Sequence, residues 1–328
     1  MLPRLTRHAA ALLSAIALAY GGGTAGAAEW PTKTVQIIVS YAPGGSTDTL
    51  ARKIADELGR QLDESVIVQN FDGAGGTLGT TKAAHAANDG SVLFLGQISS
   101  HGIAPALYRK LNYDPVADFE PVVRVYSVPN VLVVPKEFPA DTYAEFLKVA
   151  QSKKLRFASS GVGSSIHLSG ELFKAATGLD LVHVPFRGSG EAVPALLGGN
   201  VDLMFDNVPS AIPHIRSGAL KALAVTTAER SAALPDVPTL REVGGPDLAD
   251  FAVQAWFGVF VPAGSAAQTV AAINEKLNAV LESAAFRDFA KSQAAIIDGG
   301  TPEDLSLHVA AELEKWNGVV KAAAIPKK

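Results

Sequence analysis

Short apolar strands alternate with helices along most of this chain, and this alternation limits the folds open to it. Residues 35–39 form an apolar run rich in β-branched side chains, which is typical of a buried strand. After a Pro-Gly-Gly turn, Leu50, Ile54, Leu58 and Leu62 recur every four residues, as they would on one face of a helix. Because helices that join parallel strands cover both faces of a sheet, the pattern predicts an α/β protein.

The same unit returns in the second half of the chain, which predicts two α/β lobes. Further strands are expected at 65–68, 91–95, 155–158, 181–185, 201–205 and 259–261, and further helices just after Gly79, at 168–173 and at 191–197. Beyond 261 we expect only helices, at about 266–283 and 302–320, packed back on the first lobe. Extended apolar segments near 125–129 and 251–258 are the expected crossings between the lobes. They predict a discontinuous lobe 1 (28–127 and 253–328) and a continuous lobe 2 (128–252).

The N-terminal residues have the pattern of an export signal. Arg4 and Arg7 precede a 12-residue apolar run at 9–20, and Ala25 and Ala27 fit the small-residue cleavage rule. A run of this length is too short to cross about 30 Å of hydrocarbon as a helix. We therefore predict a signal peptide at 1–27, cleaved after Ala27, and an exported protein in the periplasm.

Composition excludes several classes of function. The chain has no cysteine, which rules out disulfides, thiolate metal sites and cysteine nucleophiles. Its formal net charge of −4 offers no basic excess for a phosphate backbone, so no nucleic-acid partner is expected. The histidines show no metal-binding spacing, and we expect neither a metal nor a cofactor.

Two glycine-rich loops follow the first strands. The segment 41–48 contains two glycines directly before Ser46 and Thr47, which are expected to begin a helix. The free N–H groups at the start of a helix can bind an anion. The alternative is an ordinary turn with a capping serine. The segment 71–79 fails the dinucleotide-binding pattern because Leu78 stands where the third glycine belongs, and no P-loop occurs. Nucleotide binding is therefore not expected.

Two more loops carry hydroxyls and one cation. In 159–167, His167 stands where the G-x-S-x-G elbow of serine hydrolases needs its last glycine, so a nucleophilic Ser164 or Ser165 would lack its usual turn. In 183–191, Arg187 could bind a carboxylate or pair with Glu191 on the surface. Asp206 follows a strand and could face a crevice or cap a helix.

Several segments together resemble one protein family, the Bug family of periplasmic substrate-binding proteins of tripartite tricarboxylate transporters. The resemblance covers essentially the whole chain after the signal. The segments that carry it are 41–48, 70–77, 161–165, 183–188, 234–239 and 256–264, with Trp316.

The resemblance implies a two-lobe, type II periplasmic binding-protein fold with a ligand cleft between the lobes. It implies no enzyme activity, a small carboxylate as ligand (a di- or tricarboxylate, an acidic amino acid or an aromatic acid), and inner-membrane transporter subunits as partners. We expect a monomer. The alternatives are a secreted serine hydrolase and a ligand sensor without a transport role. Phe186 stands where the family often has tyrosine. The expected ligand-binding residues are Pro43, Gly44, Gly45, Ser46, Thr47, Asp48, Gly75, Gly76, Thr77, Ser159, Gly161, Gly163, Ser164, Ser165, His167, Phe186, Arg187, Gly188 and Asp206.

Overall fold

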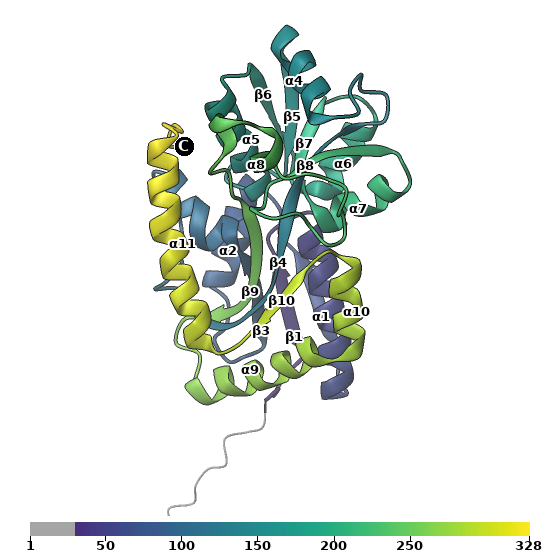
Figure 1. Cartoon of the computed structure of the whole chain (residues 1–328). Coiled ribbons are helices and arrows are strands. Elements are labelled where there is room, and N and C mark those ends of the chain that lie inside the picture. Colours follow the sequence, from purple (N-terminus) through teal and green to yellow (C-terminus); the bar gives the residue numbers. More distant parts are fainter. Residues whose placement is uncertain (1–29) are drawn as a thin grey trace, which may run out of the picture.

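The computed structural model describes residues 30–328, and its strands form two connected sheets, one above the other in Figure 1. The lower sheet contains β1 (Val35–Val39), β2 (Val66–Asn70), β3 (Val92–Gln97), β9 (Gln254–Pro262) and β10 (Ile296–Gly299). The upper sheet contains β5 (Leu155–Ser159), β6 (Leu181–Pro185), β7 (Leu203–Asn207) and β8 (Leu220–Val225). The long strand β4 (Phe119–Pro135) belongs to both sheets.

Helices surround both sheets, as the alternating pattern predicts. The face of the first helix that carries Leu50, Ile54 and Leu58 is fully buried, which confirms the four-residue spacing as a core signal. The helices are α1 (Ser46–Leu62), α2 (Thr77–Ala84), α3 (Ala104–Leu107), α4 (Tyr143–Ser152), α5 (Ser165–Thr177), α6 (Ser189–Leu197), α7 (Val208–Arg216), α8 (Leu240–Val243), α9 (Ala267–Glu282), α10 (Ala284–Ser292) and α11 (Pro302–Ala322), with single turns η1 (Ala74–Gly76), η2 (Ser99–Ile103) and η3 (Pro246–Leu248).

The sheets are mixed, which corrects the expectation of purely parallel sheets. The pairs β1–β2, β1–β3, β5–β6 and β5–β7 are parallel. The pairs that involve β4 or β9 are antiparallel, because these strands carry the chain from one sheet to the other and back. Helices α9 and α11 return to pack on β4, as expected for the C-terminal part.

One strand of the lower sheet contradicts the expectation that only helices follow residue 261. Strand β10 is four residues long and pairs antiparallel with β4, with Ile296 opposite Ser127 and Ile297 opposite Tyr126. Its two isoleucines are too few to show a strand period in the sequence. Strand β8 and helices α3, α4, α8 and α10 were not predicted either. The predicted export signal and its cleavage after Ala27 lie outside the described residues.

The chain passes between the two sheets at one level. Along β4, Pro129 pairs with Gln254 of β9, whereas the next residue, Asn130, pairs with Asn207 of β7. The second crossing runs from Val253 into β9, and Thr226 joins the two crossings. Its hydroxyl donates to the Val253 carbonyl (2.6 Å) and accepts from the Asn130 N–H (3.1 Å).

Among residues 30–328, no helix combines the length and the apolar character needed to cross a bilayer.

Replacing Thr226 with valine should lower the free energy of unfolding by about 1–3 kcal/mol, because two buried backbone groups lose their partner. Thr81→Val is the matched control, since the Thr81 hydroxyl bonds only to a carbonyl one turn earlier in the same helix. Denaturant midpoints of the two variants measure the difference. Equal midpoints would show that the Thr226 bonds contribute nothing at the crossing.

Candidate functional site

The segments 41–48, 71–79, 159–167 and 183–191 are called loops one to four. Loop one leads into α1 and is shaped by Asp48, which lies in the first turn of that helix. The Asp48 carboxylate accepts from the Gly44 N–H (3.0 Å) and from the amide of Asn70 (3.0 Å), and it pairs with Arg52. Gly44 has a φ of +88°, a conformation that favours glycine. Because the Asp48 carboxylate bonds to groups next to it, the cavity side of the loop is left to Ser46 and Thr47. The predicted residue Asp48 therefore holds the loop and does not line a cavity.

Loop two contributes close backbone approaches. Gly75 and Gly76 both have positive φ, and the Tyr41 hydroxyl donates to the Gly75 carbonyl (2.9 Å). A Cβ added to Gly75 would lie 1.7 Å from the Val162 carbonyl oxygen, so only glycine lets loops two and three meet. Thr77 bonds back to the carbonyl of Ala74. Gly75 thus makes a contact between the lobes, whereas Gly76 and Thr77 contact residues of their own lobe.

Loop three forms the N-terminus of α5. Ser164 caps the helix: its hydroxyl accepts from the His167 N–H (3.1 Å) and donates to the Gly161 carbonyl (2.8 Å). The His167 Nδ1 accepts from the Gly163 N–H (3.2 Å). A Cβ added to Gly163 would lie 3.1 Å from the Tyr108 ring of the other lobe.

Two histidines lie beneath loop three with their rings tilted by 41° to each other. The rings of His167 and His183 lie 4.2 Å apart, and the Ser159 hydroxyl lies 2.5 Å from the His183 Nε2. Burial lowers the pKa of His167 to about 3 and that of His183 to about 4. Both imidazoles are therefore neutral at pH 7, and they support the loop by hydrogen bonding.

The basic residue of loop four, Arg187, is exposed to solvent. Arg187 pairs with Glu191 (2.9 Å) and Asp72 (3.4 Å), and about two thirds of its side chain is exposed. Its backbone carbonyl accepts from the Ala42 N–H (3.1 Å), and Gly188 packs on Ala42. Arg187 therefore follows the surface-pair alternative. Gly75, Gly161, Phe186 and Arg187 line a separate cavity of about 560 Å³ together with Tyr108 and Lys328.

A small cavity lies where loops one, three and four meet. Its volume is about 20 Å³, room for about one water molecule. Two direct hydrogen bonds cross it, from the Ser46 hydroxyl to Asn207 Oδ1 (2.9 Å) and from the Ser165 N–H to the Ser99 hydroxyl (3.3 Å). The lining residues are Tyr41, Gly45, Ser46, Thr47, Gln97, Ser99, Ser160, Ser164, Ser165, Ile166, Ser189 and Asn207.

This lining joins predicted residues to others that the sequence analysis missed. Gly45, Ser46, Thr47, Ser164 and Ser165 were predicted. The missed ones include Gln97 and Ser99, and Asn207. The signal that could have found them is their position at or just after the carboxyl ends of β3 and β7, where crevices form in α/β sheets.

The lining is rich in neutral hydrogen-bond donors and holds no charged side chain. The Gln97 amide nitrogen is buried and has no partner, although its oxygen lies 3.5 Å from the Thr47 hydroxyl. Helices α1, α5 and α6 all begin at this cavity, with Ser46, Ser165 and Ser189 at their first positions. The partial positive charge of each helix N-terminus therefore faces the cavity.

Asp206 lies within β7 and behind the lining, whereas the sequence analysis placed it after the strand. It is fully buried, and the hydroxyls of Ser189 (2.6 Å) and Ser210 (2.5 Å) donate to its two oxygens. The Ser189 hydroxyl lies 3.2 Å from that of Ser160, so a chain of hydroxyls leads from Asp206 to the cavity. Burial raises the pKa of Asp206 to about 6, against the effect of its two serine partners.

The serines of loop three do not form a catalytic arrangement. Ser164 bonds to backbone groups, and the Ser165 N–H bonds to Ser99. Outside this loop, the Ser100 hydroxyl lies 2.9 Å from His101 Nδ1, and both residues are buried. The serine of loop three that contacts an imidazole is Ser159, which is completely buried and bonds to the backbone of Gly161. A substrate could not reach it, so the geometry offers no support for a serine hydrolase.

Asp206→Asn should change how stability depends on pH. Below about pH 3 the Asp206 carboxyl is mostly protonated in both the folded and unfolded states. As pH rises toward 6, the unfolded chain loses this proton first, so the wild-type protein loses stability. The variant lacks this loss. The free energy of unfolding of the variant minus that of the wild type should therefore rise by about 2 kcal/mol between pH 4.5 and pH 7.5. Urea unfolding at the two pH values measures the change, and an unchanged difference would contradict the raised pKa.

Several known proteins are similar to this chain in sequence. A family model described as "Tripartite tricarboxylate transporter family receptor" matches residues 50–325. Protein BugT of Bordetella pertussis is 36% identical over 320 residues, covering 97% of each chain.

Solved structures share the fold. The chain superposes on periplasmic binding protein BugD with a TM-score of 0.87 and 33% identity, covering 91% of this chain and all of that one. It superposes on MatC from Rhodopseudomonas palustris with bound malate with a TM-score of 0.84 and 38% identity, covering 89% of this chain and all of that one. The two-lobe periplasmic binding-protein fold is thereby confirmed, and the family is one of receptors and not of enzymes. The chain belongs to the tripartite tricarboxylate transporter receptor family, which includes the Bug proteins.

Proposed function

We propose that this protein is an exported solute-binding protein that captures a small organic carboxylate by closing its two lobes around it. The observation that carries the proposal is the cavity between the lobes, where the N-termini of α1, α5 and α6 converge on neutral donors. MatC, a relative in structure, holds malate, a dicarboxylate.

The cleft suits an anion although the protein is acidic. Each helix N-terminus carries a partial positive charge, and the serine and threonine hydroxyls around it can donate to an anion. The net charge of −4 is spread over the whole chain and is screened beyond about 10 Å at ordinary salt. Local donors therefore decide which ligand binds.

Specific side chains are assigned to the ligand. Ser46 and Thr47 on one lobe and Ser165 on the other would donate to its carboxylate oxygens. The unpartnered amide nitrogen of Gln97 would gain an acceptor, which removes the cost of burying it alone. Asp206 would act through Ser189 by fixing the direction of that hydroxyl. The remaining predicted residues, such as Gly75 and Gly188, would shape the loops.

Ligand entry requires the lobes to separate. A cavity of about 20 Å³ cannot admit a dicarboxylate, and direct bonds such as Ser46–Asn207 close it. Rotation about the crossings at Pro129–Asn130 and at Val253 would open the cleft. A ligand that touches both lobes favours the closed arrangement. The lobe boundaries that we propose are 28–127 with 253–328, and 128–252.

The sequence and the relatives support a periplasmic setting. A signal peptide cleaved after Ala27 would deliver a monomer to the periplasm, where BugD is a binding protein. The family description supports inner-membrane subunits of a tripartite transporter as partners. Delivery to those subunits, rather than sensing alone, is the role that we propose.

Calorimetry with malate, citrate and glutarate tests the ligand class. At least one should bind, and Thr47→Val should weaken it about 10- to 100-fold, because a hydrogen bond to a charged group contributes about 1.5–3 kcal/mol. Thr177→Val is the control, since the Thr177 hydroxyl bonds to a carbonyl within its own helix. Binding of sugars or cations with no binding of any acid would contradict the proposal.

Gly190→Ala tests closure. Gly190 lies in the first turn of α6, and a Cβ there would lie 2.1 Å from the Pro43 carbonyl oxygen of the other lobe. Alanine favours a helix over glycine, so the fold should survive while the lobes cannot close. Malate should then bind at least tenfold more weakly and cause no decrease in the radius of gyration.

Gly318→Ala in α11 is the matched control for closure, because a Cβ there meets nothing within 4 Å. It should bind and compact like wild type. Compaction of Gly190→Ala to the wild-type extent would refute closure at loop one.

A further inference from the structure

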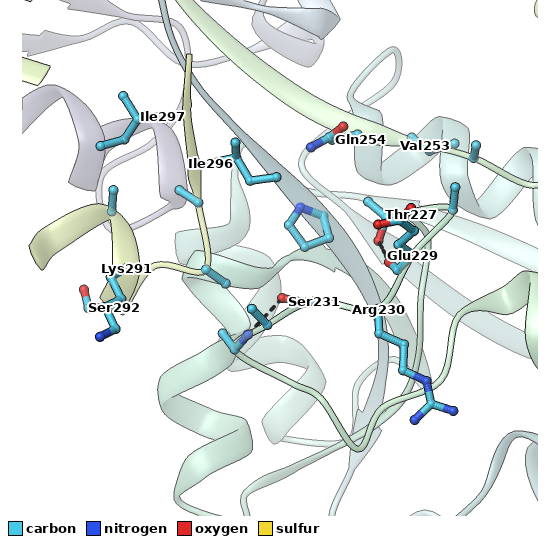
Figure 2. Close-up of a pocket in the computed structure, with 18 of the residues that line it drawn as sticks. Thr227, Glu229, Arg230, Ser231, Val253, Gln254, Lys291, Ser292, Ile296 and Ile297 are labelled. Carbon is cyan, nitrogen blue, oxygen red and sulfur yellow. Dashed lines mark hydrogen bonds between the residues drawn. The ribbon is translucent and has the colours of Figure 1, made fainter. Parts of the chain in front are cut away.

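A cavity much larger than the one between the loops lies at the level where the chain crosses between the sheets. Its volume is about 1220 Å³, and it shares no lining residue with the small cavity between the loops. Both crossings line it, through Pro129 and through Val253 with Gln254. The segment 227–233 forms one wall, and α10 with β10 forms another (Figure 2).

Much of this lining is apolar. Ile296 on β10 is 63% exposed, which is unusual for an isoleucine, and Ile297 follows it. In Figure 2, Ile296 lies between Lys291 on one side and Val253 with Gln254 on the other. The apolar residues that line the cavity are Ala228, Ala232, Ala233, Val253, Ala290, Ala294, Ala295, Ile296 and Ile297, beside Pro129 and Ala252. A ligand here could bury an apolar body.

The charges around the cavity are mainly positive, in contrast to the acidic chain as a whole. Five basic and two acidic side chains line it; the acidic ones are Glu229 and Asp288. Arg230 is paired with Glu242 (2.8 Å) and Lys315 with Glu312 (2.9 Å).

Three of the basic side chains remain available to a ligand. Within residues 30–328, Arg216, Arg287 and Lys291 form no ion pair. Arg287 and Lys291 are four residues apart on α10, so they lie on one face of that helix. An acidic group bound there would meet two cations at once.

We propose that this cavity is a second binding site, for an amphipathic anion with an apolar body and one acidic head group. The apolar body packs on Ile296, Ile297 and Val253, and the head group pairs with Arg287 and Lys291. This chemistry differs from that of the cleft between the loops, which is lined by neutral donors and is far smaller. A compact hydrophilic dicarboxylate has little apolar surface to bury against the isoleucines.

Two probes test the site on the full-length mature protein. One is the fluorescent anion 8-anilinonaphthalene-1-sulfonate, and the other is octanoate, compared with the uncharged 1-octanol by calorimetry. We expect saturable binding of one molecule of either anion and at least tenfold weaker binding of 1-octanol. The double variant Arg287→Ala/Lys291→Ala should lose at least tenfold in affinity for both anions.

The matched control is Lys148→Ala/Lys321→Ala, which removes two exposed charges elsewhere and should bind both anions like wild type. Thr47→Val, which alters the cleft, should also leave the binding of 8-anilinonaphthalene-1-sulfonate unchanged. Loss of the probe in Thr47→Val would place it in the cleft and overturn the proposal. No saturable binding, equal affinity for 1-octanol, or wild-type affinity in the Arg287 and Lys291 double variant would also overturn it.

Discussion

One side-chain hydroxyl, that of Thr226, ties together the two places where the chain passes between the sheets. It bonds to the backbone of Asn130 in one crossing and of Val253 in the other, and all three groups are buried. Because both crossings lie at the same level, rotation of one lobe against the other needs few backbone torsions to change. The geometry of the cleft therefore depends on this short connection more than on any contact within the loops.

Charges are arranged so that the cleft stays neutral. Asp48 pairs with Arg52, Arg187 pairs with Glu191, and Asp206 is buried behind serine hydroxyls. Each of these charged residues shapes a loop while backbone N–H groups and hydroxyls face the cavity. Such donors can bind an anion by direction as well as by charge, because a helix N-terminus presents its N–H groups in a fixed orientation. The larger cavity is lined instead by apolar residues and by basic side chains, three of which form no ion pair within residues 30–328.

Local sequence patterns predicted many of the strands and helices, because each depends on spacing within a few residues, but they did not predict β8 or α4. The strands at 35–39 and 181–185 match β1 and β6, and the loops that follow strands form the cleft. Gln97 was missed because a lone glutamine after a strand has no distinctive pattern. Strand β10 was missed because its pairing with β4 is a tertiary contact. The roles of Asp48 and Arg187 depend on partners that only the fold brings near, Asn70 and Asp72.

The pairing of β3 with β9 constrains the order in which the fold can be completed during synthesis. Strand β3 pairs with β9, so Leu95 finds its partner Val259 only after the whole upper sheet has emerged. Until then the edge of β3 is an open row of backbone groups, and closing such a long loop is slow. The upper sheet is built from one continuous stretch and can form first. The nascent chain would therefore keep an exposed edge at β3 until β9, in its last quarter, has been made.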